Sequence, residues 1–437
     1  MMFGFTLQRS LRDGKTGRGG THPYHTASGR DAFHRVLLLQ ILAVGIFLAG
    51  STHASDWPNW RGPNRDGVST EKGLSFDWPK TGPKILWTAG VGTGFSSVAI
   101  ADGRLFTMGN EDDADVVRCL DAASGKPIWS HNYECPLDPN LFEGGPTSTP
   151  TVDGDRVYTI SRLGHVYCLD AASGKSVWSR ILTEDTEIPA PGWGYAGSPV
   201  VHGKMLLLNV GEAGMALDKM TGKTIWASEP EESGYTTPVV LKRAGKELAI
   251  FSSGKYFSAV DLSSGETLWS HRWLTRYGMN ACDPIAHNGH VFITSGYGKG
   301  ATLLKHAPEE PEEIWKAKVL RSQLSAPIRI GDFVYGIDGD ENAREPALKC
   351  IEFMTCKEVW ADTSVGFGSL IATDGKLIIL TATGELFVGR ASAKGWKQFA
   401  RAKVLEGKCW TPPALANGRL YCRNADGELV CLDLRKP

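Results

Sequence analysis

The chain has 437 residues, 42% of them hydrophobic, and can therefore bury one large core or roughly two to three smaller ones. Its 47 Lys and Arg nearly balance its 48 Asp and Glu. This balance leaves no strongly basic or acidic surface, which argues against nucleic acid as a partner and against a polybasic contact with lipid.

Residues 1–54 have the features of an export signal. Arg and Lys outnumber Asp in the first 35 residues, and an apolar stretch from 36 to 50, interrupted by Gln40, precedes small and polar residues. We predict a signal peptide with a long basic segment, cleaved near Ala54, and hence a periplasmic or secreted protein. The long basic segment also leaves open an uncleaved N-terminal anchor. After cleavage, no stable membrane span is expected.

Residues 55–82 are expected to form an N-terminal strap. The segment 56–69 reads DWPNWRGPNRDGVS and combines turn-forming residues with two aromatic side chains, Trp57 and Trp60. Turn formers favour irregular surface structure, and aromatic rings can anchor it. We therefore predict a strap that lies over one end of the domain formed by residues 83–437.

That domain is built from a repeat. Segment 119–129 reads CLDAASGKPIW, and it returns as CLDAASGKSVW at 168–178 and as ALDKMTGKTIW at 216–226. A copy at 259–269 keeps Asp, Gly and Trp, and a copy at 350–360 has Glu352 and Cys356 in place of Asp and Gly. Trp315 ends a more divergent copy. The constant spacing predicts one domain made of similar units.

Each copy predicts a β-hairpin that docks onto its neighbour. The Asp side chain can hydrogen-bond the turn backbone, Gly supplies the positive φ that the turn needs, and Trp lies on the following strand. There the ring can pack between adjacent sheets while its indole N–H bonds a carbonyl. The docking positions are Trp87, Trp129, Trp178, Trp226, Trp269, Trp315, Trp360, Asp121, Asp170, Asp218, Asp261, Gly125, Gly174, Gly222 and Gly265.

The unit predicts an all-β, eight-bladed β-propeller of four-stranded antiparallel blades. Upstream of the hairpins, a small-residue strand, a Gly turn and an apolar run recur at 148–160, 198–208 and 411–421. Two strands there and two in the hairpin give four, and units of about 36 to 49 residues match the length of a propeller blade.

The ends of the domain predict how the ring closes. The last hairpin strand reaches Asp433 without a following Trp strand, whereas 83–87 contains Trp87 with no hairpin before it. We expect the N-terminal strand to complete the C-terminal blade, which removes an exposed sheet edge. Trp strands close the other blades, except that Phe399 is expected to close the seventh.

The repeat resembles the tryptophan-docking motif of quinoprotein alcohol dehydrogenases, and residues 216–226 match that motif throughout. It is also similar to the repeats in the propeller lipoprotein of the outer-membrane β-barrel assembly machinery, a family whose role is protein binding. The resemblance covers approximately residues 85–434. The opening segment 56–69 resembles that of many uncharacterised quinoprotein-like propellers, and it implies no function.

The resemblance implies two alternative functions, an oxidoreductase and a protein-binding scaffold. The dehydrogenases imply a pyrroloquinoline quinone- or metal-dependent oxidoreductase that uses the channel. The chain departs from them because it has no adjacent Cys–Cys pair and few insertions long enough to wall a cofactor pocket. We therefore expect no cofactor, no catalytic residues and a non-catalytic binding scaffold.

Neither the cysteines nor the acidic clusters predict a redox or metal site. Cys119, Cys168, Cys350 and Cys431 share one repeat position that holds Ala in other copies, so we interpret them as small core residues. Cys350 with Cys356, and Cys409 with Cys422, are candidate disulfides. Segment 338–342 gathers acidic residues but lacks the spacing of a calcium loop, which favours a solvated turn.

Function is expected at the rim and channel, where residues before the inner strands depart from the repeat. Exposed aromatics with Arg and Asn suit recognition of a peptide or sugar. The chain is therefore predicted to bind a protein segment or glycan in the envelope. The candidate binding residues are Trp193, Tyr195, Tyr235, Arg276, Asn280, Asp283, Arg321, Gln323, Phe367 and Trp410.

Overall fold

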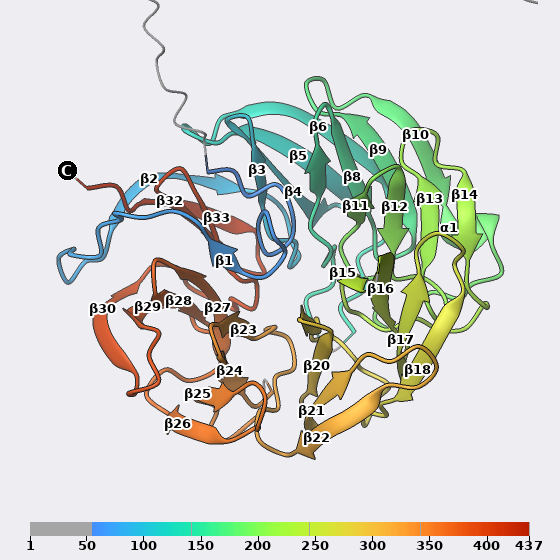
Figure 1. The fold of residues 1–437 in the computed structure, drawn as a ribbon. Coiled ribbons are helices and arrows are strands. Elements are labelled where there is room, and N and C mark those ends of the chain that lie inside the picture. The colour runs from blue at the N-terminus through green and yellow to red at the C-terminus, as the bar shows by residue number, and fades with distance from the viewer. Residues whose placement is uncertain (1–54, 141, 244, 341, 437) are drawn as a thin grey trace, which may run out of the picture. The chain divides into compact units, whose positions relative to one another are not determined.

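The computed structural model describes residues 55–140, 142–243, 245–340 and 342–436. The predicted signal peptide lies outside these residues. The described part is a ring of β-sheets with one short helix, α1 (Leu182–Asp185) (Figure 1). No helix among the described residues is long and apolar enough to cross a membrane.

The first four blades follow one another along the chain. From the inner to the outer strand they are β3 (Ala99–Ala101), β4 (Arg104–Glu111), β5 (Ala114–Asp121) and β6 (Pro127–Glu134); β7 (Thr151–Asp153), β8 (Arg156–Ile160), β9 (His165–Asp170) and β10 (Ser176–Ile181); β11 (Val200–His202), β12 (Met205–Leu208), β13 (Met215–Asp218) and β14 (Thr224–Ala227); β15 (Val239–Arg243), β16 (Lys246–Ser252), β17 (Tyr256–Asp261) and β18 (Thr267–Arg272).

Blades 5 to 8 repeat the pattern, and the last two recruit strands from the N-terminal region. They are β19 (Ile285–His287), β20 (His290–Ser295), β21 (Gly300–Lys305) and β22 (Glu312–Ala317); β23 (Ile328–Ile330), β24 (Phe333–Asp338), β25 (Ala347–Glu352) and β26 (Glu358–Asp362); β27 (Gly368–Thr373), β28 (Lys376–Thr381), β29 (Glu385–Arg390) and β30 (Lys397–Lys403), with β1 (Val68–Ser69) beside β27; β31 (Ala414–Ala416), β32 (Arg419–Arg423), β33 (Glu428–Asp433) and β2 (Lys84–Gly90).

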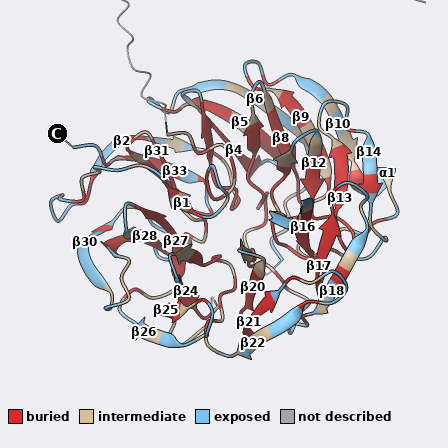
Figure 2. Ribbon diagram, in the orientation of Figure 1, coloured by how far each residue is buried: buried red, intermediate tan, exposed pale blue. Residues whose placement is uncertain are grey.

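This arrangement confirms the predicted eight-bladed propeller and its closure. Strand β2 pairs antiparallel with β33 and places Trp87 opposite Cys431, so the N-terminal strand is the outer strand of blade 8. Inner strands of neighbouring blades contact one another around the central channel, as β3 does with β7 and β7 with β11. Each hydrophobic cluster joins adjacent blades, and the strongly exposed strands are the outer ones (Figure 2).

The docking motif performs the structural role that its residue types predict. The Asp121 carboxylate accepts hydrogen bonds from the Ser124 amide at 2.8 Å and the Ser124 hydroxyl at 2.6 Å. Gly125 has a φ of 70° and lies so close to the Trp87 ring that a Cβ atom would be 2.6 Å from it. Trp87 Nε1 donates to the carbonyl of Ala122 in the next blade. Each turn thus joins two blades.

Further blade interfaces repeat this contact. Trp226 Nε1 donates to the Leu262 carbonyl at 3.0 Å, and Trp269 Nε1 reaches His306 Nδ1 at 2.7 Å. The same indole bond is made by Trp129, Trp178, Trp315 and Trp360. Because each of these indole rings lies between two blades and bonds to the next one, the stabilising contacts are distributed around the whole propeller.

The seventh blade departs from the prediction for Phe399. As in the other docking hairpins, a β-bulge skips one residue, so Val388 pairs with Ala400 and Gly389 with Gln398. Ala400 therefore holds the position of the docking Trp, and Phe399 takes the bulged position with 47% of its surface exposed. Phe76 of the strap is buried in the same cluster as Ala400, and its ring lies 6.1 Å from that of Phe399. The strap supplies the missing aromatic ring.

The strap follows the inner strands, whereas the sequence predicts it over one end of the domain. Trp57 pairs with Ile100 of β3, and the Pro58 carbonyl accepts a hydrogen bond from Val152 of β7. Further along, Arg65 donates to the Val201 carbonyl, and β1 pairs in parallel with β27. The segment from Trp57 to β1 therefore lies inside the channel.

All nine cysteines have free thiols, so neither candidate disulfide is formed. Cys119, Cys168, Cys350 and Cys431 are fully buried between sheets, which confirms their role as small core residues. Burial raises the pKa of Cys119 to about 12 and that of Cys350 to about 11. These thiols therefore remain protonated and unreactive at neutral pH.

Candidate functional site

The channel ends in an aromatic cavity, here called the cup. Its volume is about 220 Å³, and it opens on the face where each chain segment arrives from the outer strand of one blade to begin the inner strand of the next. The cup is lined by Trp60, Phe95, Phe142, Thr147, Trp193, Ala196, Tyr235, Met279, Ala281, Tyr297, Leu324, Trp410, Thr411 and Pro412.

Trp60 of the strap forms the floor of the cup. Its indole Nε1 donates to Asp283 Oδ2 at 2.6 Å, and the other carboxylate oxygen accepts from the Thr237 amide at 2.7 Å. Arg61 NH1 lies 4.0 Å from the same carboxylate. Burial raises the pKa of Asp283 above its ordinary value, while Arg61 and the two hydrogen-bond donors act in the opposite direction. The Asp283 carboxylate thus fixes the orientation of the Trp60 ring.

The walls are rings that hold one another in place. Trp193 meets Tyr235 edge to face with centroids 5.9 Å apart, and Phe95 stacks on Trp410 at 5.5 Å. Phe142 packs at a tilt against Phe95, with ring centroids 6.0 Å apart. Aromatic pairs of this kind contribute about 0.5–1.5 kcal/mol beyond their burial, so the rings keep their positions before any ligand arrives.

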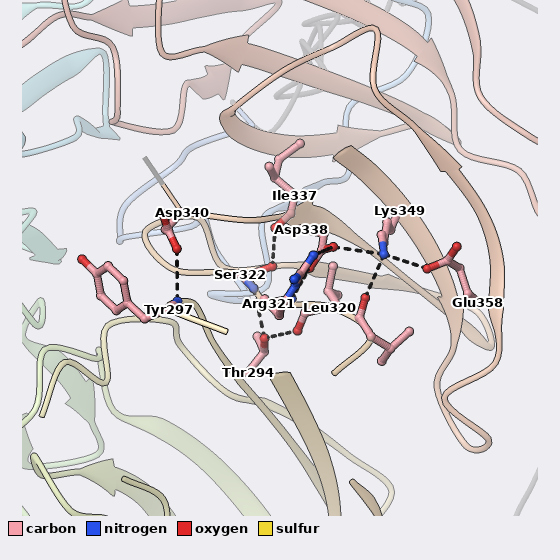
Figure 3. A network of polar contacts seen from close by, with 11 residues as sticks. Thr294, Tyr297, Leu320, Arg321, Ser322, Ile337, Asp338, Asp340, Lys349 and Glu358 are labelled. Carbon is pink, nitrogen blue, oxygen red and sulfur yellow. Dashed lines mark hydrogen bonds and ion pairs between the residues drawn. The ribbon is translucent and has the colours of Figure 1, made fainter. Parts of the chain in front are cut away.

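A polar network braces the wall formed by Tyr297 (Figure 3). The Tyr297 amide donates to Asp340 at 3.2 Å, and Arg321 forms a two-pronged ion pair with Asp338 with contacts of 2.8 and 2.6 Å. Lys349 bridges Asp338 and Glu358 at 3.0 and 2.7 Å. Burial raises the pKa of Asp338, but hydrogen bonds from Arg321 and Lys349 leave it below its ordinary value. The Asp338 carboxylate is therefore engaged in ion pairs within the fold.

Three of the candidate binding residues line the cup, namely Trp193, Tyr235 and Trp410. Asp283 lies behind its floor, and Arg276 is exposed at the rim with its guanidinium 5.3 Å from the Tyr277 ring. The structure thus brings these residues from four different loops to one end of the channel.

The other candidate residues have contacts within the fold. Asn280 is fully buried and donates to the Ser253 and Trp273 carbonyls, and Gln323 accepts from the Gly296 amide. The Tyr195 hydroxyl donates to the Pro189 carbonyl, and Phe367 packs on the cluster between blades 6 and 7. Arg321 braces the network described above.

The sequence did not single out several lining residues. Trp60, Phe95, Phe142, Met279 and Tyr297 all line the cup. Phe95, Phe142 and Met279 stand before inner strands, as do the residues that were predicted, so a search of every such loop for large apolar side chains would have found them. The sequence identifies Trp60 as an aromatic anchor of the strap, but Trp60 lies outside the repeat and nothing in the sequence places it in the lining of a cavity.

The lining does not fit an acidic quinone cofactor held with calcium. Pyrroloquinoline quinone carries carboxylates, which require Arg or Lys donors, and calcium requires several oxygen ligands. The residues lining the cup include no charged side chain, and the described residues contain no group of three or more His, Cys, Asp or Glu placed to hold a metal. The cup instead presents apolar rings with a few hydroxyl groups.

Comparison with known proteins places these features in a wider group. A family model described as outer membrane protein assembly factor BamB matches residues 112–362. No curated protein matches the sequence. The structure of BamB from Moraxella catarrhalis is 15% identical with a TM-score of 0.62, covering 80% of this chain and 99% of that chain.

Two oxidoreductase structures have a similar likeness. A europium-containing methanol dehydrogenase is 11% identical with a TM-score of 0.63, covering 86% of this chain and 89% of that chain. Quinohemoprotein alcohol dehydrogenase from Comamonas testosteroni is 14% identical with a TM-score of 0.61, covering 88% and 81%. Identities this low show only that the propeller fold is shared, so the activity has to be argued from the residues of the site.

Proposed function

This chain belongs to the family described as outer membrane protein assembly factor BamB, and we propose that it is an exported, non-catalytic scaffold that binds a protein segment in the cell envelope. The observation that carries the proposal is the uncharged aromatic cup at the mouth of the channel. Its size suits a single aromatic or large aliphatic side chain, inserted from a peptide that crosses the rim.

The construction of the cup favours binding over catalysis. Aromatic anchors in desolvated pockets supply much of the affinity of protein interfaces, and the interlocked rings reduce the entropy that binding would otherwise cost. The lining offers hydroxyl groups from Thr147, Tyr235, Tyr297 and Thr411 but no His, Cys, Asp, Glu, Lys or Arg to act as a base or nucleophile. The name of the family likewise concerns assembly of proteins.

Substitution of one wall residue tests the proposal. The probe is a neutral heptapeptide with Phe at its centre, and binding is followed by quenching of the tryptophan fluorescence of the cup. Trp193→Ala removes the ring that meets Tyr235, and we expect at least a 30-fold loss of affinity, since truncating an anchor costs about 2 kcal/mol. Ile128→Ala, on an exposed outer strand, serves as the matched control and should bind as the unsubstituted protein does.

Three results would contradict the proposal. One is equal peptide affinity for the Trp193→Ala variant and the unsubstituted protein. The second is binding of envelope oligosaccharides by a protein that ignores every peptide. The third is turnover of an alcohol or sugar in a dye-linked dehydrogenase assay after titration with pyrroloquinoline quinone and calcium, which would make the protein an oxidoreductase.

A further inference from the structure

Charged side chains surround the cup unequally. The two loops that reach the rim from blades 2 and 3, residues 182–199 and 228–238, contain acidic residues and neither Lys nor Arg. Six of these acids are exposed: Glu184, Asp185, Glu187, Glu229, Glu231 and Glu232. We call these two loops the acidic side of the rim.

The next two loops along the chain contain basic side chains. Residues 273–284 contain the exposed Arg276 and the buried Asp283, and residues 318–327 contain Lys318 and Arg321 without any acid. Lys299 lies in the turn between β20 and β21, where burial and then the positive charges of Lys316 and Arg272 lower its pKa. These segments form the basic side of the rim.

On the acidic side, Glu232 adjoins the wall of the cup. Its Oε1 accepts a hydrogen bond from the amide of Gly192 at 2.9 Å, next to the wall residue Trp193. Burial raises the pKa of Tyr235 to about 12, and the negative charge of Glu232 adds to this rise. Glu232 is exposed and has no ion-pair partner among the described residues, so its charge is available at the mouth of the cup.

On the basic side, Arg276 adjoins the opposite wall. Its guanidinium lies over Tyr277, whose ring meets the wall residue Tyr297 edge to face with centroids 5.4 Å apart. Tyr277 is 53% exposed, and the neighbouring Leu274 is 40% exposed, so an apolar surface continues from the cup onto this rim. Within the described residues Arg276 forms no ion pair.

The remaining wall is electrically neutral. Lys408 lies 4.4 Å from the centroid of the Trp410 ring and pairs with Glu143, whose neighbour Phe142 is also in the wall. This pair cancels its own charge. Glu232 on one side and Arg276 on the other thus lie next to the cup without an ion-pair partner among the described residues, and Asp340 is bound to the amide of the wall residue Tyr297.

We propose that the occupant of the cup is an extended peptide segment whose central aromatic or large aliphatic residue is flanked by a basic residue facing Glu232 and an acidic residue facing Arg276. This inference rests on the proposed function, because it assigns the chemistry of the segment that the scaffold binds. The cup selects the apolar anchor, and the two sides of the rim select the charges beside it.

Four heptapeptides test the charge pattern. All have Phe at the centre, and the residues two positions before and after it are Lys and Asp, Lys and Asn, Gln and Asp, or Gln and Asn. Each is used in both chain orders, because the cup does not fix the direction of the peptide. The measured quantity is the ratio of the affinity of each charged peptide to that of the neutral one, at low salt and in 1 M NaCl.

Each charge should strengthen binding about two- to fivefold at low salt, as exposed ion pairs do, and high salt should remove the gain. In Glu232→Gln, which keeps an acceptor for the Gly192 amide, the ratio for the Lys peptide should fall to about one. In Arg276→Gln, the ratio for the Asp peptide should fall likewise. Lys126→Gln, in the hairpin after β5 at the opposite end of the blade, should keep both ratios.

The outcomes separate this inference from the function on which it rests. If the neutral peptide binds and the charged peptides bind no more tightly, the charge pattern is wrong and the scaffold function stands. The same holds if the ratios survive both substitutions. If no peptide binds, the scaffold function fails together with the inference.

Discussion

The bond between Trp60 and Asp283 provides a direct test of how the floor of the cup is held. Trp60→Phe keeps an aromatic ring but removes the N–H that donates to Asp283 at 2.6 Å. Hydrogen bonds to charged groups contribute about 1.5–3 kcal/mol. The Thr237 amide and Arg61 remain beside the carboxylate, so we expect the free energy of unfolding to fall by about 2 kcal/mol.

Urea denaturation measures this change, with linear extrapolation of the unfolding free energy and comparison of the slopes to verify equal exposure of surface. A double-mutant cycle with Asp283→Asn assigns the loss to the pair. We expect a coupling energy of about 1–2 kcal/mol between the two positions. Trp193→Phe is the control, since its indole N–H has no hydrogen-bond partner among the described residues, and it should change stability by less than about 0.5 kcal/mol.

Equal effects of Trp60→Phe and Trp193→Phe would refute a stabilising role for the bond between Trp60 and Asp283. It is also refuted if the losses from Trp60→Phe and Asp283→Asn simply add, because independent effects would mean that the carboxylate does not hold the indole.

Two further predictions concern stability. Burial raises the pKa of Asp115 from 3.8 to about 6, so the folded state favours the protonated form, and about 3 kcal/mol of stability present below pH 4 is lost as the pH rises through about 6. Asp115→Asn should abolish that loss, and the variant should be more stable than the unsubstituted protein at pH 7 by a similar amount. Urea unfolding across this pH range measures both effects, and a variant with the same pH profile as the unsubstituted protein would contradict the prediction. Gly174→Ala should lower the melting temperature, since φ is 70° and the new Cβ would lie 2.5 Å from the Trp129 ring. Gly154→Ala, with φ at 60° and open space around the Cβ, isolates the backbone strain, and equal losses in the two variants would show that docking against Trp129 is irrelevant.

The residues that line the cup were predicted less completely than the fold. Trp193, Tyr235 and Trp410 were recognised as departures from the repeat and line the cup, whereas Asn280 and Gln323 depart from it because they hold buried backbone groups. An unusual polar residue before an inner strand can serve either purpose. Only the packing around it distinguishes the two.

Sequence alone determined the ring, because the four docked strands of each of the first seven blades are consecutive along the chain and the repeat encodes their pairing. The Asp and Gly of each hairpin set the turn, the Trp sets the contact with the next blade, and the orphan strand at Trp87 closes the circle. Even where the pattern fails at Phe399, the strand forms with the same bulge as in the other docking hairpins, and Ala400 holds the position that faces the interface.

Tertiary structure alone decided where the non-repeating strap runs and what it does. Its turn-rich sequence is compatible with a surface path, but Trp57 is 2% exposed and the segment bonds to inner strands around the channel. The floor of the cup depends on Trp60 and Asp283, which are 223 residues apart. A pair so distant belongs to no repeat unit, and only closure of the ring brings its two members together.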